Sequence, residues 1–365
     1  MEKLLELLWF FYLIQMKKLP IILSFVLLAI KLSAQTFSPS ATRTKALSDW
    51  EKLRFGAFVH FNDNTFLEKE FSQNTDPKAF NPKQIDFEGM MKTFRKAGIK
   101  YAVLTTRHTS GFCLWDSKLT SFDVANSAYP HDVVKLFVDA CRKYKIKPCL
   151  YYCLWGGGNW YPWEWNPTIK KELEGTSVKN ITLAQLTELA TIYGDIYEFW
   201  IDMQCWNTPD LKPQEMYDLI KSKQPNTIIH FNQHVQDGTE IKYFPTDIMN
   251  GEERVPPVDG HQAVRKVAGK EYYLPFEYEI TSQRADHRSL GNGLMRGSCW
   301  FTHSDSQFYP VDSLYKYIKQ SFERGGSNIL LSTAPDKSGT YRHADADSIV
   351  KLGKMIRKMK QKNSN

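Results

Sequence analysis

Acidic side chains close two of the apolar segments in this 365-residue sequence, where they could act as catalytic carboxyl groups. Asp202 directly follows the apolar run Tyr197 to Ile201, and Glu252 and Glu253 end a later run. Two carboxyl groups about 5 Å apart can cleave a glycosidic bond with retention, because one attacks the anomeric carbon while the other protonates the leaving oxygen. The pattern favours Asp202 as nucleophile and one of the two glutamates as proton donor. Neighbouring residues point in different directions, so only one glutamate can face a sugar, and adjacency does not say which.

Further polar residues stand at the ends of apolar runs and could bind the hydroxyl groups of a sugar. His60, Arg107 and His108 would serve as hydrogen-bond donors, and Glu277 closes another run. The spacings H-x-H and H-E-x-x-H do not occur, and no second Cys or His pair at ligand spacing completes a zinc site. We therefore expect no metal and no other cofactor.

The segments that carry these residues alternate between two patterns, of which the first predicts strands. Runs rich in β-branched and aromatic residues are nearly continuous in hydrophobicity, as expected for parallel strands buried on both faces. The predicted strands are Phe55 to Phe61, Ile99 to Arg107, Lys147 to Leu154, Tyr197 to Met203, Thr227 to Asn232, Asp247 to Glu252, Leu274 to Ile280 and Asn328 to Ala334.

Amphipathic segments between these runs predict helices. Pro82 and Pro213 fall near helix starts, and Gly98 and Gly325 fall where helices end. The predicted helices are Pro82 to Ala97, His131 to Tyr144, Thr182 to Tyr193, Pro213 to Lys223, Val311 to Gly325 and Ala344 to Lys360. Strand and helix in repetition, without a phosphate-binding glycine fingerprint, predict an α/β fold of the (β/α)8 TIM-barrel type, whose active site lies at the C-terminal strand ends. The stretch Gln233 to Tyr273 fits least well, with one weak strand and no convincing helix.

The first 34 residues have the pattern of a signal peptide. Two lysines after Met16 precede the apolar run Leu19 to Ile30, and small residues up to Ala34 form a cleavage site. The pattern indicates Met16 as the true start of translation. The competing interpretation of the first 34 residues is an uncleaved membrane anchor. We expect an exported protein, periplasmic or secreted, without stable membrane association after cleavage, and one catalytic domain over residues 45–362.

The net charge of +7 comes from the leader and from the basic residues at 351–365, so the body between them is close to neutral. A nucleic-acid partner is not expected, because such proteins need clustered positive charge. Most cysteines lie in apolar runs, where Cys behaves as a small buried hydrophobe, so we expect mostly free thiols. The six cysteines are Cys113, Cys141, Cys149, Cys153, Cys205 and Cys299.

The segment Tyr101 to Lys118, with Phe122 to Ser127 and Asp132 to Lys135 after it, closely resembles the α-L-fucosidases of glycoside hydrolase family 29. Shorter segments agree with this resemblance over much of the chain. They are Arg54 to Phe61, Glu70-Phe71, Lys147 to Trp155, Phe199 to Asp202, Leu274 to Glu277 and Gly325 to Leu331. The resemblance implies a (β/α)-barrel variant that removes terminal α-L-fucose from fucosylated oligosaccharides or glycoconjugates with retention.

Roles carried over from the family fall on matching positions of this sequence. Asp202 in the Phe-Trp-x-Asp strand takes the place of the nucleophile. For the general acid, the motif Asn250 to Pro257 resembles members with Gly-Glu before a proline pair, which favours Glu252, while members with Thr-Pro-Glu-Arg favour Glu253. The candidate substrate-binding residues are His60, Glu70, Phe71, Arg107, His108, Trp115, Tyr152, Trp200 and Glu277.

The sequence departs from the family at one motif. Members usually read Lys-His-His-Asp-Gly-Phe, whereas Thr109 and Ser110 stand here in place of the second histidine and the acid. Loss of an imidazole partner for a sugar hydroxyl costs about 1 to 3 kcal/mol if nothing replaces it. This departure leaves open a retaining glycosidase acting on a related sugar such as a galactoside. A carbohydrate-binding barrel that has lost catalysis is a separate alternative, favoured if neither Glu252 nor Glu253 lies within reach of Asp202. The C-terminal β-sandwich usual in the family is not expected.

Overall fold

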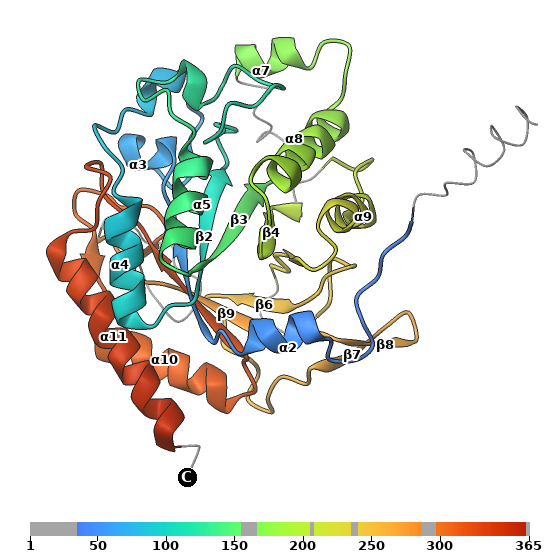
Figure 1. Ribbon diagram of the computed structural model, residues 1–365, viewed down its shortest axis with the longest axis vertical. Coiled ribbons are helices and arrows are strands. Elements are labelled where there is room, and N and C mark those ends of the chain that lie inside the picture. The colour runs from blue at the N-terminus through green and yellow to red at the C-terminus, as the bar shows by residue number, and fades with distance from the viewer. Residues whose placement is uncertain (1–34, 155–165, 205–207, 235–239, 287–296, 363–365) are drawn as a thin grey trace, which may run out of the picture. The chain divides into compact units, whose positions relative to one another are not determined.

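The computed structural model describes residues 35–154, 166–204, 208–234, 240–286 and 297–362. The chain divides between residues 37 and 38 into two units, and every helix and strand named below lies in the second. Eight strands form one sheet in the order β5-β4-β3-β2-β1-β13-β9-β6, with every neighbouring pair parallel. Figure 1 shows β2, β3 and β4 of this sheet side by side. Their bounds are β1 Phe55–Val59, β2 Tyr101–Arg107, β3 Lys147–Cys153, β4 Glu198–Asp202, β5 Ile228–Phe231, β6 Met249–Glu252, β9 Phe276–Thr281 and β13 Asn328–Thr333.

The two edge strands of this sheet, β5 and β6, lie close enough to be joined by hydrogen bonds outside the regular ladder. The Asp247 backbone N–H donates to the Ile229 carbonyl over 2.8 Å, and the Ile229 N–H returns a bond of 2.8 Å to Asp247 Oδ2. Asn250 Nδ2 donates to Asn232 Oδ1 over 3.0 Å. The sheet is therefore a nearly closed barrel of eight parallel strands, and the predicted (β/α)8 fold class is confirmed.

All eight predicted strands are present, with bounds that agree to within about two residues. They were recognisable because both faces of a barrel strand are buried, one against the interior and one against the outer helices, which gives continuous apolar runs. Tyr101–Arg107 shows this directly, since all its residues are buried.

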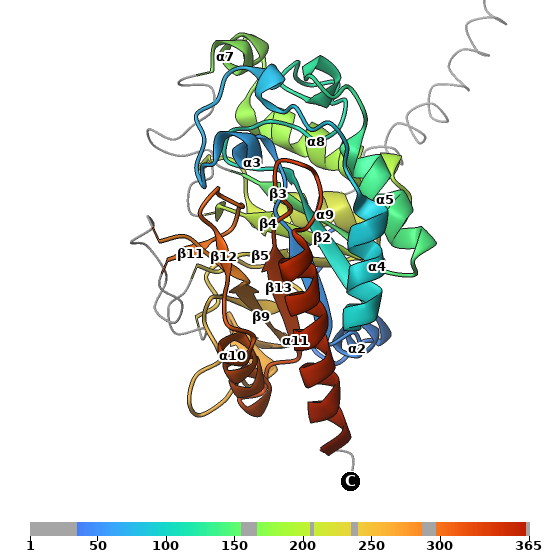
Figure 2. The same cartoon turned by 90° about the vertical axis from the view of Figure 1, so that its left-hand side faces the viewer.

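Helices surround the barrel, and α11 packs against α4 and α10 (Figure 2). In α4 the buried residues Phe87, Met90, Met91 and Phe94 recur at the spacing of one helix face. The helices of the described part are α2 Lys45–Glu51, α3 Asp63–Leu67, α4 Phe87–Ala97, α5 Val133–Lys143, α7 Pro167–Glu172, α8 Val178–Ile192, α9 Pro213–Lys223, α10 Val311–Glu323 and α11 His343–Lys362.

The prolines behave differently at the two predicted helix starts. Pro213 is the first residue of α9, as predicted. The start at Pro82 was wrong, because the Asp86 side chain accepts a hydrogen bond of 2.8 Å from the Gly89 N–H and caps a helix that begins at Phe87. Gly98 adopts a left-handed conformation with φ of 84° and ends this helix, as predicted.

Several short elements escaped prediction. The poorly fitting stretch contains a hairpin, β7 Val264–Val267 and β8 Lys270–Tyr273, whose turn at Ala268 and Gly269 has positive φ at both residues. A three-stranded sheet consists of β10 Gln283–Arg284, β11 Ser298–Cys299 and β12 Gln307–Phe308. Strands of two residues are too short for any periodic pattern, so this sheet left no recognisable signal.

The strands place alternate side chains inside the barrel in layers. On β4 these are Glu198, Trp200 and Asp202, from the buried end of the strand to its C-terminal end. Trp200 packs in the interior with Phe58 of β1 and Tyr151 of β3. The Trp200 ring thus separates the deeply buried Glu198 from Asp202, which can reach solvent.

Five cysteines of the described part are free and buried, as predicted, and Cys205 lies outside the described residues.

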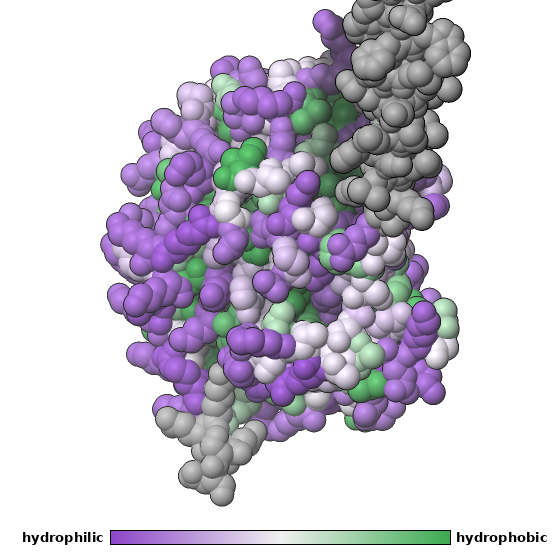
Figure 3. Space-filling view, turned by 45° about the vertical axis from the view of Figure 1, so that its right-hand side comes forward, coloured by the Kyte–Doolittle hydropathy of each residue, from purple (hydrophilic) through white to green (hydrophobic). Residues whose placement is uncertain are grey.

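The predicted signal peptide also lies outside the described residues. Within the ranges described, no helix is both long enough and apolar enough to cross a membrane. The face turned forward in Figure 3 is mostly hydrophilic, with apolar side chains in small separate groups.

Candidate active site

A cavity of about 360 Å³ lies at the C-terminal ends of the barrel strands, where TIM-barrel enzymes have their active sites. Its acidic lining residues are Glu70, Asp202, Glu252 and Glu279. Its rings are those of Phe58, His60, Phe71, His108, Tyr151, Trp200, His234 and Trp300. Carboxyl groups set among aromatic walls suit a ligand that has both polar groups and apolar faces.

Asp202 ends β4, and hydrogen-bond donors surround its carboxylate. The Tyr151 hydroxyl donates to Oδ2 over 2.7 Å, while the Met203 N–H and Asn232 Nδ2 donate to Oδ1 over 2.7 and 3.0 Å. His234 Nε2 lies 3.1 Å from Oδ1. Burial by itself would raise the pKa of Asp202, but His234 and the hydrogen bonds from Tyr151 and Met203 outweigh it and lower that pKa below its usual range. Asp202 is therefore an ionised and firmly oriented carboxylate at neutral pH.

Glu252 faces the same cavity and is linked to Asp202 through one shared donor. Asn232 Nδ2 lies 2.8 Å from Glu252 Oε2 and 3.0 Å from Asp202 Oδ1. The distance between the two carboxylate oxygens therefore cannot exceed the sum of these two distances. The His234 ring also lies between them, with Nδ1 3.5 Å from Glu252 Oε2. Glu253 is buried outside the cavity lining, where the Thr281 hydroxyl donates to its Oε1 over 2.7 Å. Of the two neighbouring glutamates, only Glu252 reaches the cavity.

Two histidines of the cavity wall are held through Nδ1. His60 Nδ1 lies 2.9 Å from the Ser332 hydroxyl, and His108 Nδ1 lies 3.2 Å from the Thr109 hydroxyl. Burial lowers the pKa of His60 well below its usual value and that of His108 to about 4. Both rings are therefore neutral imidazoles at neutral pH, each able to offer its Nε2 to a ligand.

Glu70 lines the cavity and also holds the segment that carries Trp300. Its Oε2 accepts a hydrogen bond of 2.9 Å from the Trp300 N–H, and its Oε1 lies 2.9 Å from His303 Nε2. Phe71, next to it, is 51% exposed at the rim. Glu70 thus fixes the segment of Trp300 by binding the Trp300 backbone N–H.

A second polar cluster lies deeper in the barrel, one layer below Trp200. Ligand-type atoms of Glu198, His230 and Glu277 lie within 4.8 Å of one another, and all three residues are buried. The Trp50 indole N–H donates to Glu198 Oε2 over 2.9 Å, and the Tyr101 hydroxyl donates to Glu277 Oε2. Burial and the nearby Glu198 raise the pKa of Glu277 well above its usual value, so Glu277 is a neutral acid. This reduced negative charge favours a structural cluster over a cation site.

The sequence model of the family described as Alpha-L-fucosidase matches residues 37–361. The chain belongs to the alpha-L-fucosidase family. Alpha-L-fucosidase 1 of Arabidopsis thaliana is 31% identical to it over 158 residues, which cover 42% of this chain and 29% of the plant protein. The plasma alpha-L-fucosidase of Homo sapiens is 29% identical over 156 residues, which cover 40% of this chain and 31% of the human protein. This alpha-L-fucosidase family member therefore spans less than a third of the length of these relatives.

Solved structures of similar fold bear the same family name. Alpha-L-fucosidase isoenzyme 1 from Paenibacillus thiaminolyticus superposes with a TM-score of 0.68 at 23% identity, covering 87% of this chain and 76% of that one. Alpha-L-fucosidase AlfC from Lactobacillus casei, solved with α-L-fucose as product, gives a TM-score of 0.64 at 18% identity, covering 87% of this chain and all of that one. At these identities the two structures support the barrel fold of this family member.

Some candidate residues of this alpha-L-fucosidase family chain lie outside the cavity lining. Tyr152 points away, where its hydroxyl donates to Gln185 Oε1 over 2.7 Å, and its neighbour Tyr151 lines the cavity instead, because successive strand side chains face opposite sides. Arg107 lies 5.2 Å from the centre of the Tyr152 ring and donates to the Cys153 carbonyl. These contacts give Arg107 and Tyr152 structural partners away from the cavity.

Trp115 and Glu277 also lie outside the cavity lining. The Trp115 indole N–H donates to Glu188 Oε2 of α8 over 2.8 Å, and Glu277 belongs to the deeper cluster. Trp115 belongs to the loop after β2 and not to a strand end, and Glu277 stands near the start of β9, deeper in the barrel than Glu279 on the same interior face. The remaining candidates, His60, Glu70, Phe71, His108, Trp200, Asp202 and Glu252, all line the cavity.

The residues of this fucosidase-family cavity that sequence reasoning missed include His234, Trp300, Tyr151 and Glu279. His234 follows β5 in a left-handed conformation with φ of 47°, and Trp300 comes from a segment without periodic pattern. Tyr151 and Glu279 had a usable signal, strand alternation, because Tyr151 shares the interior face with Cys153 and Glu279 shares it with Glu277. Neither His234 nor Trp300 carries such a signal.

Gly251 immediately precedes Glu252 on β6, and its backbone leaves no space for a side chain. An added Cβ would lie 2.0 Å from the Arg254 carbonyl oxygen and 2.5 Å from Phe276 Cζ. We expect Gly251→Ala to lose about 1 to 3 kcal/mol of unfolding free energy and to lower kcat by displacing Glu252. Urea unfolding and steady-state kinetics measure both effects. Gly175→Ala, a substitution with no atom within 4 Å but at φ of 81°, should lose some stability and leave kcat unchanged; equal kcat in both variants would contradict the prediction.

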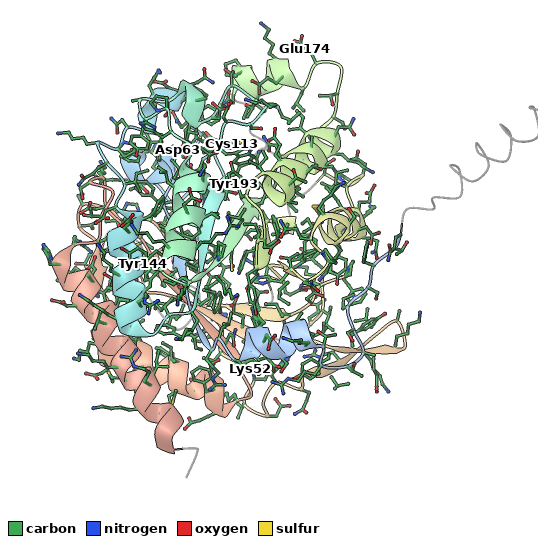
Figure 4. All side chains as sticks on the ribbon, in the orientation of Figure 1. Lys52, Asp63, Cys113, Tyr144, Glu174 and Tyr193 are labelled. Atoms are coloured by element: carbon green, nitrogen blue, oxygen red, sulfur yellow. The ribbon has the colours of Figure 1, made fainter. Side chains whose placement is uncertain are left out.

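The Ser110 position, where the family motif usually has an acid, faces a carboxyl group from another element. The Ser110 hydroxyl donates to Oδ1 of Asp63, the first residue of α3, over 2.8 Å, and Asn74 Nδ2 lies 3.1 Å from its Oδ2 (Asp63 is labelled in Figure 4). Burial raises the pKa of Asp63 from 3.8 to about 6, against the lowering effect of these hydrogen bonds.

The raised pKa of Asp63 makes the stability of the fold depend on pH. Between pH 3.8 and about 6 the folded protein keeps the Asp63 proton, whereas the unfolded chain releases it. The stabilisation of the fold by protonated Asp63 is therefore complete below pH 3.8 and is lost as pH rises through about 6. At neutral pH the loss amounts to about 3 kcal/mol. We expect Asp63→Asn to remove this dependence, so that its unfolding free energy relative to wild type rises between pH 4 and pH 7. Urea titrations at several pH values test this, and parallel curves would show that Asp63 does not titrate as described.

Proposed function

We propose that the chain is a retaining exo-α-L-fucosidase that removes terminal α-L-fucose from oligosaccharides or glycoconjugates. The observation that carries the proposal is that Asp202 and Glu252 face one cavity and share the Asn232 Nδ2 donor, at 3.0 and 2.8 Å. This spacing suits a retaining pair, in which the two carboxyl groups lie about 5 to 5.5 Å apart. Family membership supplies the substrate class.

In the first step an Asp202 oxygen attacks the anomeric carbon while the bond to the leaving oxygen breaks and that oxygen takes a proton from Glu252. In the second step Glu252 removes a proton from water, whose oxygen attacks the anomeric carbon and frees Asp202. Hydrogen bonds from Tyr151, Met203 and Asn232 hold the Asp202 carboxylate for attack. The sugar thus leaves with the configuration with which it entered.

The wall of the cavity offers contacts that suit a deoxy sugar. Neutral His60 and His108 can each direct Nε2 to a hydroxyl group, because Nδ1 is held by Ser332 or Thr109. Trp300 presents an aromatic ring for the apolar side of the sugar. These contacts bind the sugar and leave the chemistry to the two carboxyl groups.

A related-sugar glycosidase is the second candidate, and Thr109 is the observation that favours it. Thr109 lines the cavity at the position of the family's second histidine, so one imidazole contact is replaced by a hydroxyl. A panel of nitrophenyl glycosides with purified residues 35–365 separates the candidates. We expect turnover of the α-L-fucoside, and turnover of galactosides alone would contradict the proposed function. The binding-only alternative loses support because both carboxyl groups reach one cavity.

We also propose export to the periplasm or the medium, supported by the basic, apolar and small-residue order between Met16 and Ala34. Mass spectrometry of the protein recovered from the exported fraction should find Gln35 as its first residue. Recovery of an intact leader in the membrane fraction would favour the uncleaved anchor.

A further inference from the structure

A third carboxyl group of the cavity, that of Glu279, is not used by the proposed reaction. Glu279 lies on β9 with its Cα in register with that of Glu252 on β6, and it is only 2% exposed. It lines the same cavity as Asp202. With Glu70, which holds the Trp300 segment, four carboxyl groups line the cavity where a retaining reaction needs two.

The hydrogen bonds to the carboxyl groups of Asp202, Glu252 and Glu279 differ. Asp202 accepts hydrogen bonds from Tyr151, Met203 and Asn232, and Glu252 accepts one from Asn232. In the described part of the chain, no protein group donates a hydrogen bond to the Glu279 carboxyl. Donors stabilise a negative charge, so the cavity is built to ionise Asp202 and offers Glu279 no such help.

The charges around Glu279 act in the same direction. Burial, followed by the carboxyl groups of Glu252, Asp202, Glu277 and Glu253, raises the pKa of Glu279 well above its usual value. The other titratable groups of the cavity wall are Glu70, His60, His108, His234, Tyr151 and Lys242. Burial and repulsion favour the neutral acid, as in enzymes that keep a carboxylic acid protonated so that it can donate a hydrogen bond.

We propose that Glu279 stays protonated and donates a hydrogen bond to a hydroxyl oxygen of the bound sugar, as a specificity-determining residue of this site. This inference rests on the proposed function, because it assumes that a neutral sugar occupies the cavity. Its carbonyl oxygen can accept a bond from the same or a neighbouring hydroxyl. A sugar that carries a carboxylate would bring a further negative charge toward Asp202 and Glu252, and the site should reject it.

Glutamine and alanine substitutions separate a neutral donor from other roles. Glutamine has the shape of a protonated glutamic acid and keeps one donor and one acceptor, whereas alanine keeps neither. We expect Glu279→Gln to retain kcat/KM for the nitrophenyl α-L-fucoside within about threefold, and Glu279→Ala to lose about tenfold or more, mainly through KM. Glu252→Gln, the same substitution at the register partner, should instead lose kcat. Melting temperatures show whether each variant is folded.

The pH profile gives a readout that a merely structural role would not change. In wild type, kcat/KM should fall as pH rises far enough to ionise Glu279, since the donor is lost and a charge appears beside Asp202. In Glu279→Gln this fall should move to higher pH. Equal loss in the glutamine and alanine variants, or no loss in either, would overturn the proposal.

Binding of L-fucose, measured by calorimetry on the same variants, distinguishes failure of this inference from failure of the proposed function. Wild type that binds L-fucose without hydrolysing the fucoside would contradict the hydrolase. In that case tenfold weaker binding by Glu279→Ala, with glutamine unaffected, would still support the neutral donor. Absence of L-fucose binding by wild type would overturn it.

Discussion

Asp202→Asn should lower kcat for the nitrophenyl α-L-fucoside by about 10⁴-fold or more, because an amide cannot replace the attacking carboxylate. Asparagine has nearly the same shape, and one of its atoms can still accept from Met203 and Asn232 at the Oδ1 position. The fold and L-fucose binding should therefore persist. Single-turnover kinetics, with a melting curve of the variant, measures this effect.

A smaller side chain at the same position tests the chemistry more directly. Asp202→Gly leaves an open face at the anomeric carbon, so added azide should restore turnover and yield the β-L-fucosyl azide, with inverted configuration. Retention of more than a tenth of wild-type kcat by Asp202→Asn, in the absence of azide, would exclude Asp202 as the nucleophile.

Glu252→Gln should lower kcat by about 10² to 10⁴-fold, because glutamine can neither protonate the leaving oxygen nor activate water. The effect should be larger for a fucosylated disaccharide than for a nitrophenyl fucoside, since nitrophenolate leaves without protonation. Glu253→Gln is the matched control next to it in the chain. Its carboxyl group is bound by the Thr281 hydroxyl outside the cavity, so this variant should retain most of the activity.

Azide distinguishes an acid/base residue from one that only supports the fold. Azide needs no general base, so it should restore turnover of the nitrophenyl fucoside by Glu252→Gln and give the α-L-fucosyl azide, with retained configuration. The reverse pattern, in which Glu253→Gln is inactive and rescued while Glu252→Gln is active, would transfer the acid/base role to Glu253.

Both predictions depend on a cavity that the sequence described only in part. Asp202, His60 and Glu252 were recognisable because each ends an apolar strand, and parallel strands deliver their ends to the same side of a barrel. Arg107 and Tyr152 occupy similar places in the sequence but have partners away from the cavity. Strand-end position therefore finds the region of a site, and it does not find which side chains enter it.

His234 and Trp300, which line the cavity but were not predicted, show why the sequence described it only in part. His234 enters the site through a left-handed backbone conformation after β5, and Trp300 is held there by Glu70, some 230 residues earlier in the chain. Neither depends on a local periodic pattern. Tertiary contacts between distant segments decide such placements, so they become visible only in the folded chain.

By itself the sequence determined the eight strands, the barrel and the position of Asp202, because burial on both faces of a parallel strand leaves a continuous apolar run with a polar end. Only the tertiary structure decided which of Glu252 and Glu253 faces the cavity. They are neighbours on the chain, and the turn at Glu253, with φ of 53°, directs one carboxyl group to Asn232 and the other to Thr281. Burial of a strand sets the apolar pattern in its sequence. The directions of the two neighbouring glutamate side chains depend instead on contacts made across the barrel.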